Sequence, residues 1–374
     1  MNNFYPIRIL HVVGAMNIAG TETMLMNIYR NLDRAKVQFD FISYQQNAHY
    51  DDEIKRMGGR IIRLSNTHSV KEIYEAIKKY GPYHAVHSHT LFHCGIANLA
   101  AKLAKVNVRI AHAHTTMDSC DSLIRKLYIK AMRYIINTFS TKLLACSNQA
   151  GKYLFGEKGL NKPFFTYFPN LIEYPKFLQE PKMDVLKFKD EKGLQNSLVI
   201  GHIGRFIKTK NQMFLLDIIK SMLKKADNVK LVLVGDGDLR LQTEEAAKCK
   251  GLDDNIIFVG LRNDIPTILH VMDIFVFPSI YEGLGLVLLE AQASGLPCVV
   301  SEAIQPEADL DINLFSRLSL ADGAEVWANK ILELAGKKEK DAKKIINGFE
   351  ANGYSLSQGI SKLLNIYQLT MEDA

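Results

Sequence analysis

Short runs of apolar residues alternate along this chain with longer stretches in which apolar residues recur every three or four positions. The short runs predict strands at 7–13, 38–43, 60–64, 85–88, 109–113, 142–146 and 164–168, and again at 198–203, 230–234, 256–259, 274–277 and 297–301. The intervening stretches, such as 21–32, 70–80 and 95–105, have the period of amphipathic helices. This alternation predicts an α/β fold with parallel sheets and helical crossovers.

One interruption of this alternation divides the chain. Residues 174–196 are rich in proline and lysine and show neither period, so we interpret them as a linker. A chain of 374 residues is also long enough for more than one core. We therefore expect two doubly wound, Rossmann-like domains, at 1–175 and 176–355, and an amphipathic helix within 356–374. Ligands are then expected in the cleft between the two domains.

The composition narrows the class of protein. Hydrophobic residues make up 47% and charged residues 23%, as in folded globular proteins. No apolar run approaches the roughly 18–20 residues that cross a bilayer, and residues 1–17 lack the order of charges of a secretory signal. The five cysteines show no CxxC spacing, which disfavours a zinc ribbon or a disulfide framework. We expect a cytoplasmic protein.

Positive charge is concentrated in the first half of the chain. Residues 1–175 hold 22 Lys and Arg against 12 Asp and Glu, whereas residues 176–374 hold 24 against 28. A basic half predicts an anionic partner. Residues 122–142 read as a basic amphipathic helix, which is either a core helix with a solvated face or a peripheral contact with an anionic membrane. No signature of nucleic-acid binding accompanies the charge, so no nucleic acid is expected as a partner.

Glycines and basic residues gather in the loops after the predicted strands of the second half, where parallel sheets bind ligands. Three successive loops begin with a glycine, namely Gly204, Gly235 and Gly260. Arg205 and Lys210 follow the first of these glycines directly before a predicted helix, and Arg262 follows the third. Fixed cations at the start of a helix suit a diphosphate. A surface ion pair is the structural alternative for Arg205.

The fourth loop has the strongest pattern. Gly283 and Gly285 lie just before a predicted helix, whose first N–H groups can bind an anion. Glu282 lies in the loop and Glu290 lies eight positions later, in the helix. Carboxylates on either side of a bound phosphate can accept hydrogen bonds from the ribose and the sugar hydroxyls of a nucleotide sugar. A helix cap or an ion pair is the structural alternative for Glu290.

With these motifs, residues 199–301 resemble the donor-binding domain of the retaining GT-B glycosyltransferases of glycosyltransferase family 4. The resemblance implies a GT-B architecture, with the helix of 356–374 packed back on the first domain. It implies that Arg205 and Lys210 bind the donor diphosphate, Glu290 the ribose and Glu282 the transferred sugar. The implied donor site comprises Gly20, Gly204, Arg205, Lys210, Gly235, Gly260, Arg262, Glu282, Gly283, Leu284, Gly285, Leu286 and Glu290, and the implied catalytic residues are His114, Arg205, Lys210 and Glu282.

The first half carries a turn and a group of histidines. Gly20 opens a turn similar to the family's Gly-Gly-x-Glu, with Ala19 in place of the first glycine. Histidines at 87 and 89, and at 112 and 114, form pairs on one side of a strand. A metal site is one interpretation, but the pairs lack carboxylates and no HExxH or CxxC accompanies them, so no metal is expected. The resemblance makes His114, or alternatively His112, the histidine at the reacting sugar; a buried core histidine is the structural alternative.

The resemblance further implies a retaining transfer that needs neither a metal nor another cofactor. The donor would be a nucleotide sugar, with a UDP-sugar as the first expectation, and fixed cations would stabilise the leaving diphosphate. Residues 302–307 resemble the branch that builds capsular and exopolysaccharides, whose acceptors are saccharides, commonly lipid-linked, at the inner membrane face. The alternatives are a sugar-nucleotide epimerase or hydrolase of the same fold and a non-catalytic partner subunit. An NAD dehydrogenase is disfavoured because Arg240 replaces the third glycine of GxGxxG.

Overall fold

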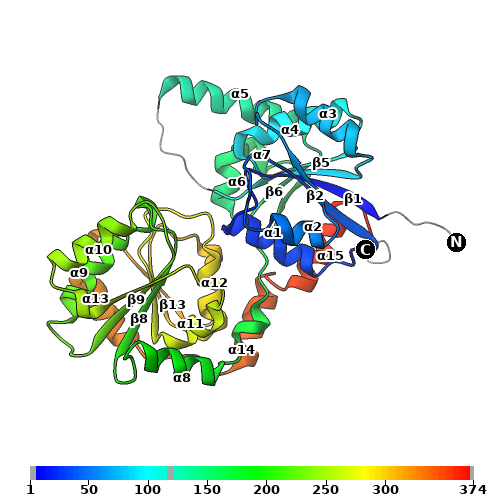
Figure 1. The fold of residues 1–374 in the computed structure, drawn as a ribbon. Helices are drawn as coiled ribbons and strands as arrows, with labels where there is room; N and C mark the ends of the chain where they lie inside the picture. Colours follow the sequence, from blue (N-terminus) through cyan, green and yellow to red (C-terminus); the bar gives the residue numbers. More distant parts are fainter. Residues whose placement is uncertain (1–5, 116–121, 371–374) are drawn as a thin grey trace. The chain divides into compact units, whose positions relative to one another are not determined.

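The computed structural model describes residues 6–115 and 122–370 and divides the chain into two compact units (Figure 1). Unit 1 comprises Met1–Ile172 together with Gly353–Ala374, and unit 2 comprises Glu173–Asn352. Unit 2 is therefore inserted into the sequence of unit 1, and the chain enters and leaves it once.

Unit 1 is built on a parallel sheet of seven strands in the order β3-β2-β1-β4-β5-β6-β7. The strands are β1 (Ile7–Val12), β2 (Val37–Ser43), β3 (Ile61–Arg63), β4 (Ala85–Ser88), β5 (Val108–Ala113), β6 (Lys142–Ala145) and β7 (Phe165–Tyr167). The direction of strand addition reverses between β1 and β4, as in doubly wound folds. Ligands bind such sheets at the carboxyl ends of the strands beside this reversal.

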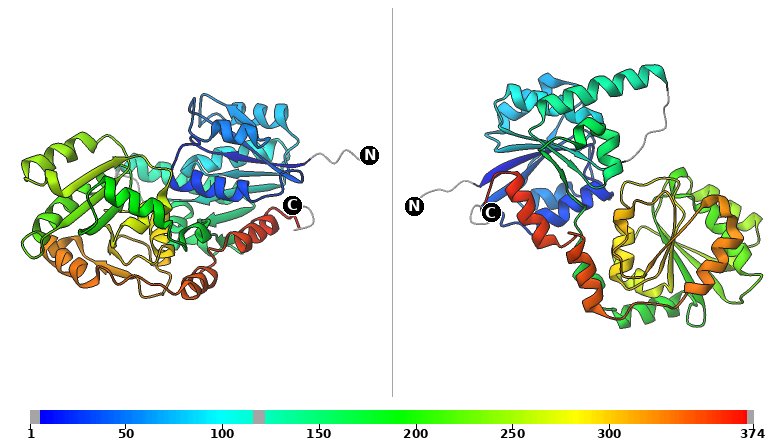
Figure 2. Two further views of the ribbon diagram at one scale, coloured as in Figure 1. Left: turned by 60° about the horizontal axis from the view of Figure 1, so that its bottom comes forward. Right: turned by 180° about the vertical axis from the view of Figure 1, so that it is seen from behind.

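Helices cover both faces of this sheet because neighbouring residues of its strands point to opposite faces. Ile9 packs with α1 (Gly20–Arg30), α2 (Asp51–Arg56) and α15 (Leu356–Ile366), whereas Leu10 packs with α3 (Val70–Tyr80) and α4 (Cys94–Leu103). The remaining helices of the unit are α5 (Leu123–Phe139), α6 (Asn148–Phe155) and α7 (Glu157–Leu160) (Figure 2). Unit 1 thus has two core layers, one on each face of the sheet.

Helix α15 completes the core of unit 1 from the far end of the sequence. Its Leu363 and Leu364 are buried in the same cluster as β1 and α1. Gly359 lies against Leu171, where a Cβ atom would stand 2.3 Å from the leucine Cδ1 atom. The His84 Nε2 atom lies 2.7 Å from the carbonyl oxygen of Tyr367. Close packing and a polar contact together hold this helix to the sheet.

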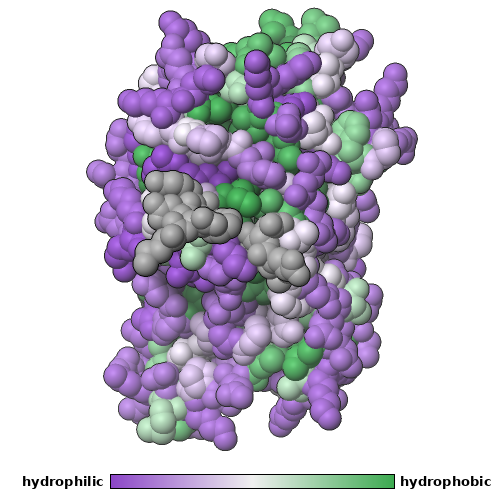
Figure 3. All heavy atoms as spheres, turned by 90° about the vertical axis from the view of Figure 1, so that its right-hand side faces the viewer, coloured by the Kyte–Doolittle hydropathy of each residue, from purple (hydrophilic) through white to green (hydrophobic). Residues whose placement is uncertain are grey.

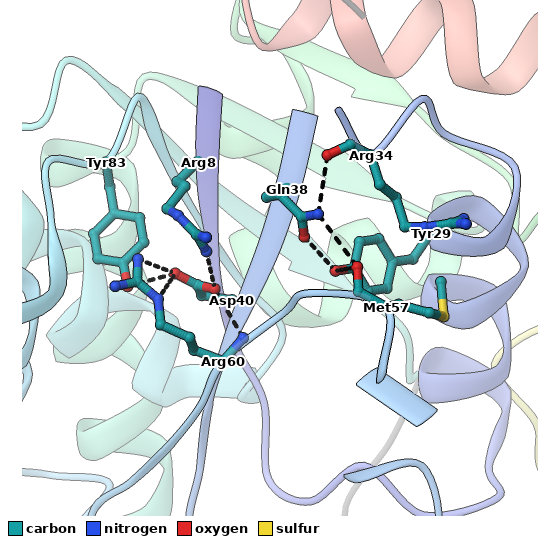
Figure 4. Close-up of polar contacts among 8 residues, drawn as sticks. All are labelled: Arg8, Tyr29, Arg34, Gln38, Asp40, Met57, Arg60 and Tyr83. Carbon is teal, nitrogen blue, oxygen red and sulfur yellow. Dashed lines mark hydrogen bonds and ion pairs between the residues drawn. The ribbon is translucent and has the colours of Figure 1, made fainter. Parts of the chain in front are cut away.

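A buried carboxylate is neutralised within unit 1 (Figure 4). Asp40 of β2 has no exposed side-chain surface, and its Oδ1 atom accepts a hydrogen bond of 2.6 Å from Arg8. The second oxygen pairs with Arg60 at 2.7 Å and accepts the hydroxyl of Tyr83 at 2.9 Å. An unpaired buried charge would be strongly destabilising, so these three partners are what allows Asp40 to lie inside the fold.

Unit 2 is built on a parallel sheet of six strands in the order β10-β9-β8-β11-β12-β13. The strands are β8 (Leu198–Ile203), β9 (Val229–Val234), β10 (Ile256–Gly260), β11 (Ile274–Phe277), β12 (Cys298–Ser301) and β13 (Phe315–Leu318). Here the reversal lies between β8 and β11. The expected α/β architecture of two Rossmann-like units is confirmed.

Two groups of helices accompany the sheet of unit 2. Helices α9 (Gln212–Met222), α10 (Arg240–Cys249) and α13 (Gly323–Leu334) enclose one core, which contains Trp327. Helices α8 (Lys182–Glu191), α11 (Ile265–Val271), α12 (Leu286–Ala293) and α14 (Ala342–Ala351) pack on one another in sequence. The linker expected at 174–196 is wrong for α8, because Val185 and Phe188 are buried and the helix packs against α11.

Exposed apolar side chains are concentrated in one place on unit 1. On the face shown in Figure 3 hydrophilic residues predominate, and hydrophobic ones form separate small groups. By contrast, Leu123, Ile124 and Leu127 in the first turns of α5 are exposed by 79%, 81% and 69%. Within the described ranges, no helix combines the length and the apolar character needed to cross a bilayer.

Candidate active site

Backbone hydrogen bonds join three loops at the carboxyl edge of the sheet of unit 2. The amide of Gly204, after β8, donates to the carbonyl of Val234 at 2.9 Å, and the amide of Gly235, after β9, donates to Gly260 at 2.9 Å. The amide of Phe206 adds a bond of 3.0 Å to a carbonyl of the β9 loop. The glycines that the sequence analysis singled out therefore lie side by side.

Two positions in the loop after β9 admit only glycine. Gly235 has a φ of +130°, and a Cβ atom there would stand 2.2 Å from the carbonyl oxygen of Gly204. Gly237 has a φ of +153°, and its Cβ atom would stand 2.6 Å from the carbonyl oxygen of Phe206. At these two glycines a ligand can therefore approach the main chain.

Lys210 and Glu282 form an ion pair across the edge of the sheet. The Lys210 ammonium donates to the Glu282 carboxylate and lies 4.6 Å from the centre of the Phe277 ring. The two loops are also joined by the Ile280 amide, which donates to the carbonyl of Thr209 at 2.8 Å. Residues 72 positions apart in the sequence thus form one charged group.

Arg205 directly follows Gly204, in the same loop as Lys210. A Cβ atom on Gly204 would lie 3.4 Å from the Cδ atom of Lys210, and one on Gly237 would lie 3.0 Å from the Cγ atom of Arg205. The guanidinium is exposed and has no ion-pair partner among the described residues. It is therefore available to an anionic ligand.

A buried support beneath this loop was not anticipated from the sequence. Gln212, the first residue of α9, donates to the carbonyl of Arg205 at 3.0 Å and lies 3.5 Å from the Nε2 atom of His202. His202 in turn contacts the carbonyl of Val276 through Nδ1 at 3.0 Å. Burial lowers the pKa of His202 to about 4, so the imidazole is neutral. The sequence feature that could have revealed this support is His202, a polar residue inside the otherwise apolar strand β8.

Helix α12 begins at the same edge, directly after the Glu282 loop. Gly285 caps it with a φ of +80° and a ψ of 70°, in the left-handed region, and Leu286 is its first helical residue. The first amides of a helix have no intrahelical acceptor and favour an anion. Leu284 is 2% exposed, and Gly283 beside it is partly exposed. The structure thus places a helix N-terminus next to the charged pair.

Glu290 lies further along α12. Its carboxylate makes no hydrogen bond or ion pair with any residue that the structure describes. Loss of hydration raises the pKa of Glu290 to about 7, and the positive charge of Lys176 acts in the opposite direction. A carboxylate in this environment gains from any hydroxyl that donates to it.

Arg262 does not join the charged group through any contact between described residues. Its guanidinium forms an ion pair of 2.6 Å with Asp264 and lies 5.6 Å from the centre of the Phe188 ring. The hydrogen bonds that the guanidinium donates to the Asp264 carboxylate raise the pKa of Arg262. Arg262 therefore pairs with Asp264 and contacts the Phe188 ring of α8.

The turn after β1 in unit 1 opens helix α1. Ala19 is the residue before the helix, with an extended φ of −149°, and Gly20 is the first helical residue. Any residue adopts an extended φ, which explains how alanine fits where the family has glycine. The amide of Thr23 donates to the carbonyl of Ala19 at 2.8 Å and starts the helical ladder.

Five imidazoles meet at the carboxyl edge of the sheet of unit 1. His89 contacts His11 at 3.1 Å on one side and His114 at 2.9 Å on the other, and His87 contacts His112 at 3.2 Å. The two expected pairs are close, with ring centres 4.3 Å apart for 87 and 89 and 4.0 Å apart for 112 and 114. The sequence analysis missed His11, which joins the group because β1 neighbours β4.

His114 lines a cavity of about 200 Å³ within unit 1, together with Thr21, His89, His112 and Leu154. Burial lowers the pKa of His114 to about 4, while the side chain of Asn170 acts in the opposite direction. Burial likewise lowers the pKa values of the other four imidazoles. The group is therefore uncharged at neutral pH.

Comparison with known proteins identifies both units. The family model described as Glycosyltransferase Family 4 matches residues 18–173, and the one described as Glycosyl transferases group 1 matches residues 184–351. EpsF of Bacillus subtilis (strain 168), which is named as a glycosyltransferase, is 38% identical over 98% of this chain and 97% of its own length. The capsular polysaccharide biosynthesis glycosyltransferase CapH of Staphylococcus aureus is 30% identical over 96% of this chain and 98% of its own.

More distant proteins share the fold or the sequence over nearly the same length. The UDP-Gal:alpha-D-GlcNAc-diphosphoundecaprenol alpha-1,3-galactosyltransferase of Escherichia coli is 25% identical over 96% of each chain. Anabaena HepE in complex with UDP superimposes with a TM-score of 0.78 at 17% identity, covering 97% of this chain and 99% of HepE. HepE in complex with UDP-glucose gives a TM-score of 0.77 at 19% identity, covering 96% and 99%. The likeness to HepE establishes the shared fold, which is the expected GT-B architecture.

Proposed function

This chain belongs to the glycosyltransferases of family 4 and group 1, and from that premise we propose that it transfers a sugar, with retention of configuration, from a nucleotide-diphosphate sugar to a saccharide acceptor during capsule or exopolysaccharide biosynthesis. The name of CapH supports the pathway, and the match to EpsF over nearly the whole chain supports the transfer of a sugar. A UDP-sugar is the donor that the complexes of HepE favour.

The observation that carries the donor site is the grouping of cations, a carboxylate and a helix N-terminus at one edge of unit 2. Lys210 is held by Glu282, and Arg205 projects beside the same glycine without a partner among the described residues. Charge-assisted hydrogen bonds from such groups are the strong ones, and a diphosphate can accept several of them. Glu282 would bind hydroxyls of the transferred sugar, and Glu290 those of the ribose.

The chemistry follows from where charge develops. The bond between the anomeric carbon and the leaving phosphate oxygen breaks, a bond to the acceptor oxygen forms on the same face, and the acceptor proton passes to the leaving phosphate. Arg205, Lys210 and the first amides of α12 stabilise the negative charge of that phosphate. Because these groups are fixed, the transfer needs no metal ion. His114 contacts the reacting sugar in this proposal.

Ligand binding by the intact chain tests the donor site. A nucleotide at about 100 times its dissociation constant stabilises the fold by about 2.7 kcal/mol, so a panel of nucleoside diphosphates ranked by thermal shift should show UDP first. Arg205→Ala and Lys210→Ala should each weaken UDP about 10- to 100-fold, the loss of a charged hydrogen bond. Lys208→Ala, an exposed cation two residues before Lys210 in the same 3-10 helix, is the matched control. Equal affinity in all three variants would contradict the proposal.

Product analysis separates transfer from an epimerase or hydrolase of the same fold. That alternative is not favoured, because the relatives that match nearly the whole chain are named as glycosyltransferases. With the donor and an acceptor extract, we expect a glycoside that depends on both. Steady turnover of the donor that yields an epimer or a free sugar, with no glycoside, would favour the alternative.

For the acceptor, we propose a lipid-linked saccharide at an anionic membrane that α5 contacts. The name of the Escherichia coli galactosyltransferase describes a diphosphoundecaprenol acceptor. In α5, only Met132 and Ile136 are buried, whereas the exposed face combines Leu123 and Leu127 with Lys130 and carries no acidic residue. A core helix with a purely basic outer face would not expose these leucines. Apolar anchors among cations are the pattern of interfacial helices.

Vesicle binding tests this contact. We expect the chain to sediment with phosphatidylglycerol vesicles, less so as salt rises, and weakly with phosphatidylcholine alone. The double variant Leu123→Ser and Leu127→Ser should lose most of this binding, because a buried leucine contributes about 1.5–3 kcal/mol. Leu241→Ser, which alters a leucine of unit 2 that is 72% exposed, is the control. Binding that ignores both salt and the leucines would refute the contact.

A further inference from the structure

The histidine group of unit 1 is larger than sugar transfer requires. The proposed reaction uses His114 alone, yet four more imidazoles converge on it from β1, β4 and β5. Because buried polar atoms are normally paired, a ring nitrogen such as Nε2 of His112, which has no hydrogen-bond partner among the described residues, is unusual. We propose that His89, His112 and His114 form a binding site for one divalent transition-metal ion.

The distances suit a single ion. One ring nitrogen from each of the three histidines lies within 4.8 Å of the other two. Nitrogens that share a tetrahedral zinc ion at about 2.0–2.1 Å stand about 3.3 Å apart, so the rings must close by no more than about 1.5 Å to bring all three to bonding distance. The same three imidazoles line the cavity of about 200 Å³, which leaves room for a water molecule as fourth ligand. Three protein ligands and one open position are typical of accessible zinc sites.

Second hydrogen bonds already orient two of these ligands. Nδ1 of His112 lies 3.2 Å from Nε2 of His87, so the free Nε2 is the nitrogen presented to an ion. Nε2 of His89 lies 3.1 Å from Nδ1 of His11, and its Nδ1 points at His114. Outer partners of this kind fix the ring and the tautomer of a metal-bound histidine. In this arrangement the ion replaces the proton shared between His89 and His114.

The neighbouring triad is a poorer site. His11, His87 and His89 also bring their nitrogens within 4.8 Å of one another. Both nitrogens of His87, however, are engaged, one by the hydroxyl of Tyr367 at 2.8 Å and the other by His112. His11 has no exposed surface and does not line the cavity. An ion would therefore enter between His89, His112 and His114 first.

The ligand set determines the metal. Both clusters of possible ligands among the described residues consist of histidine alone. Imidazole suits Zn²⁺, Co²⁺, Ni²⁺ and Cu²⁺, whereas Mg²⁺ and Ca²⁺ prefer oxygen. An ion here would occupy His114, so we expect Zn²⁺ to inhibit transfer and a chelator to restore it. That consequence rests on the proposed function, whereas the binding itself does not.

Cobalt is the probe, because its visible absorption reports four-coordinate nitrogen ligands. Titration of the chelator-treated full chain should give one Co²⁺ per chain, displaced by Zn²⁺ and not by Mg²⁺. His114→Ala should weaken Co²⁺ at least 100-fold, and His11→Ala, which removes only an outer partner, about 10- to 100-fold. His93→Gln is the matched control, since the His93 ring makes an edge-on contact with His68 outside the group. Cys249→Ser removes an exposed thiol as an alternative ligand.

Melting curves in chelator identify any variant that fails to fold, and such a variant is replaced by His89→Gln. The proposal is overturned by absence of Co²⁺ binding, by equal affinity in His114→Ala and His93→Gln, or by displacement of Co²⁺ by Mg²⁺. Binding that is lost only in Cys249→Ser also overturns it. None of these readouts uses activity, so they stand whether or not the chain transfers sugar.

Discussion

Glu290→Gln should stabilise unit 2 in alkaline solution while weakening its proposed ligand. Loss of hydration raises the pKa of Glu290 from 4.5 to about 7 in the folded chain, against the opposing charge of Lys176. A shift of this size, at about 1.4 kcal/mol per pH unit, corresponds to about 3 kcal/mol. The folded state therefore binds a proton more tightly than the unfolded chain does.

The sign of the pH dependence follows from this shift. Below pH 4.5 the group is protonated in both states, so its burial is not opposed by charge and the substitution should be nearly neutral. As the pH rises from 4.5 to about 7, the folded state alone retains the proton and the free energy of unfolding falls. Glutamine does not ionise, so the variant should gain less than about 1 kcal/mol at pH 5 and about 3 kcal/mol at pH 8.

Tryptophan fluorescence during urea unfolding measures this difference in unit 2 alone. The chain has a single tryptophan, Trp327, which is fully buried in the core of that unit. Glu245→Gln, at an exposed site on α10, should change nothing at either pH. With UDP present, the unchanged chain should unfold with a higher free energy than Glu290→Gln, because ribose hydroxyls favour the carboxylate over the amide. Equal stabilisation at pH 5 and pH 8 would falsify the burial argument.

Three further substitutions test packing. Asp40→Ala should leave Arg8 and Arg60 unpaired and lower the free energy of unfolding by about 3–5 kcal/mol, as measured by circular dichroism during heating. Asp52→Ala, at an exposed ion pair, is the control and should lower it by less than about 1 kcal/mol. Gly235→Ala should abolish UDP binding in calorimetry through the clash at 2.2 Å, whereas Gly251→Ala, with open space around it, should bind UDP normally. Tyr367→Phe should leave the Nδ1 atom of His87 unpaired and lower the free energy of unfolding by about 1–3 kcal/mol in urea titration.

Local patterns predicted much of this fold because its sheets are buried on both faces. In β1, β8 and β11 every residue is at least partly buried, so the sequence shows mainly apolar runs, continuous in β11 and interrupted only by Arg8 and His11 in β1 and by His202 in β8. β13 was missed, since its FSRL sequence is partly exposed and mixes polar with apolar residues. Helix α8 was taken for a linker because it buries only Val185 and Phe188 among lysines.

The candidate site, like the fold, was predicted from the sequence only in part. Glycines, cations and glutamates after consecutive strands predicted the group around Lys210 and Glu282, because parallel strands end at one edge. The pairing of Arg262 with Asp264, two residues away, depends on side-chain geometry that spacing does not encode. His11 stayed hidden for another reason: it is a single histidine in an apolar strand, and only the strand order brings it to the others.

The position of α15 constrains how the protein is made. A ribosome completes every residue of unit 2 before it reaches 353–374, which the core of unit 1 needs. During synthesis, unit 1 therefore cannot complete its core until unit 2 has been made, and the apolar surface that Leu363 and Leu364 cover stays exposed until then. Unit 2 can fold before unit 1 is complete. Premature termination before Leu356 would release a chain whose unit 2 is complete and whose unit 1 lacks α15 and is prone to aggregate.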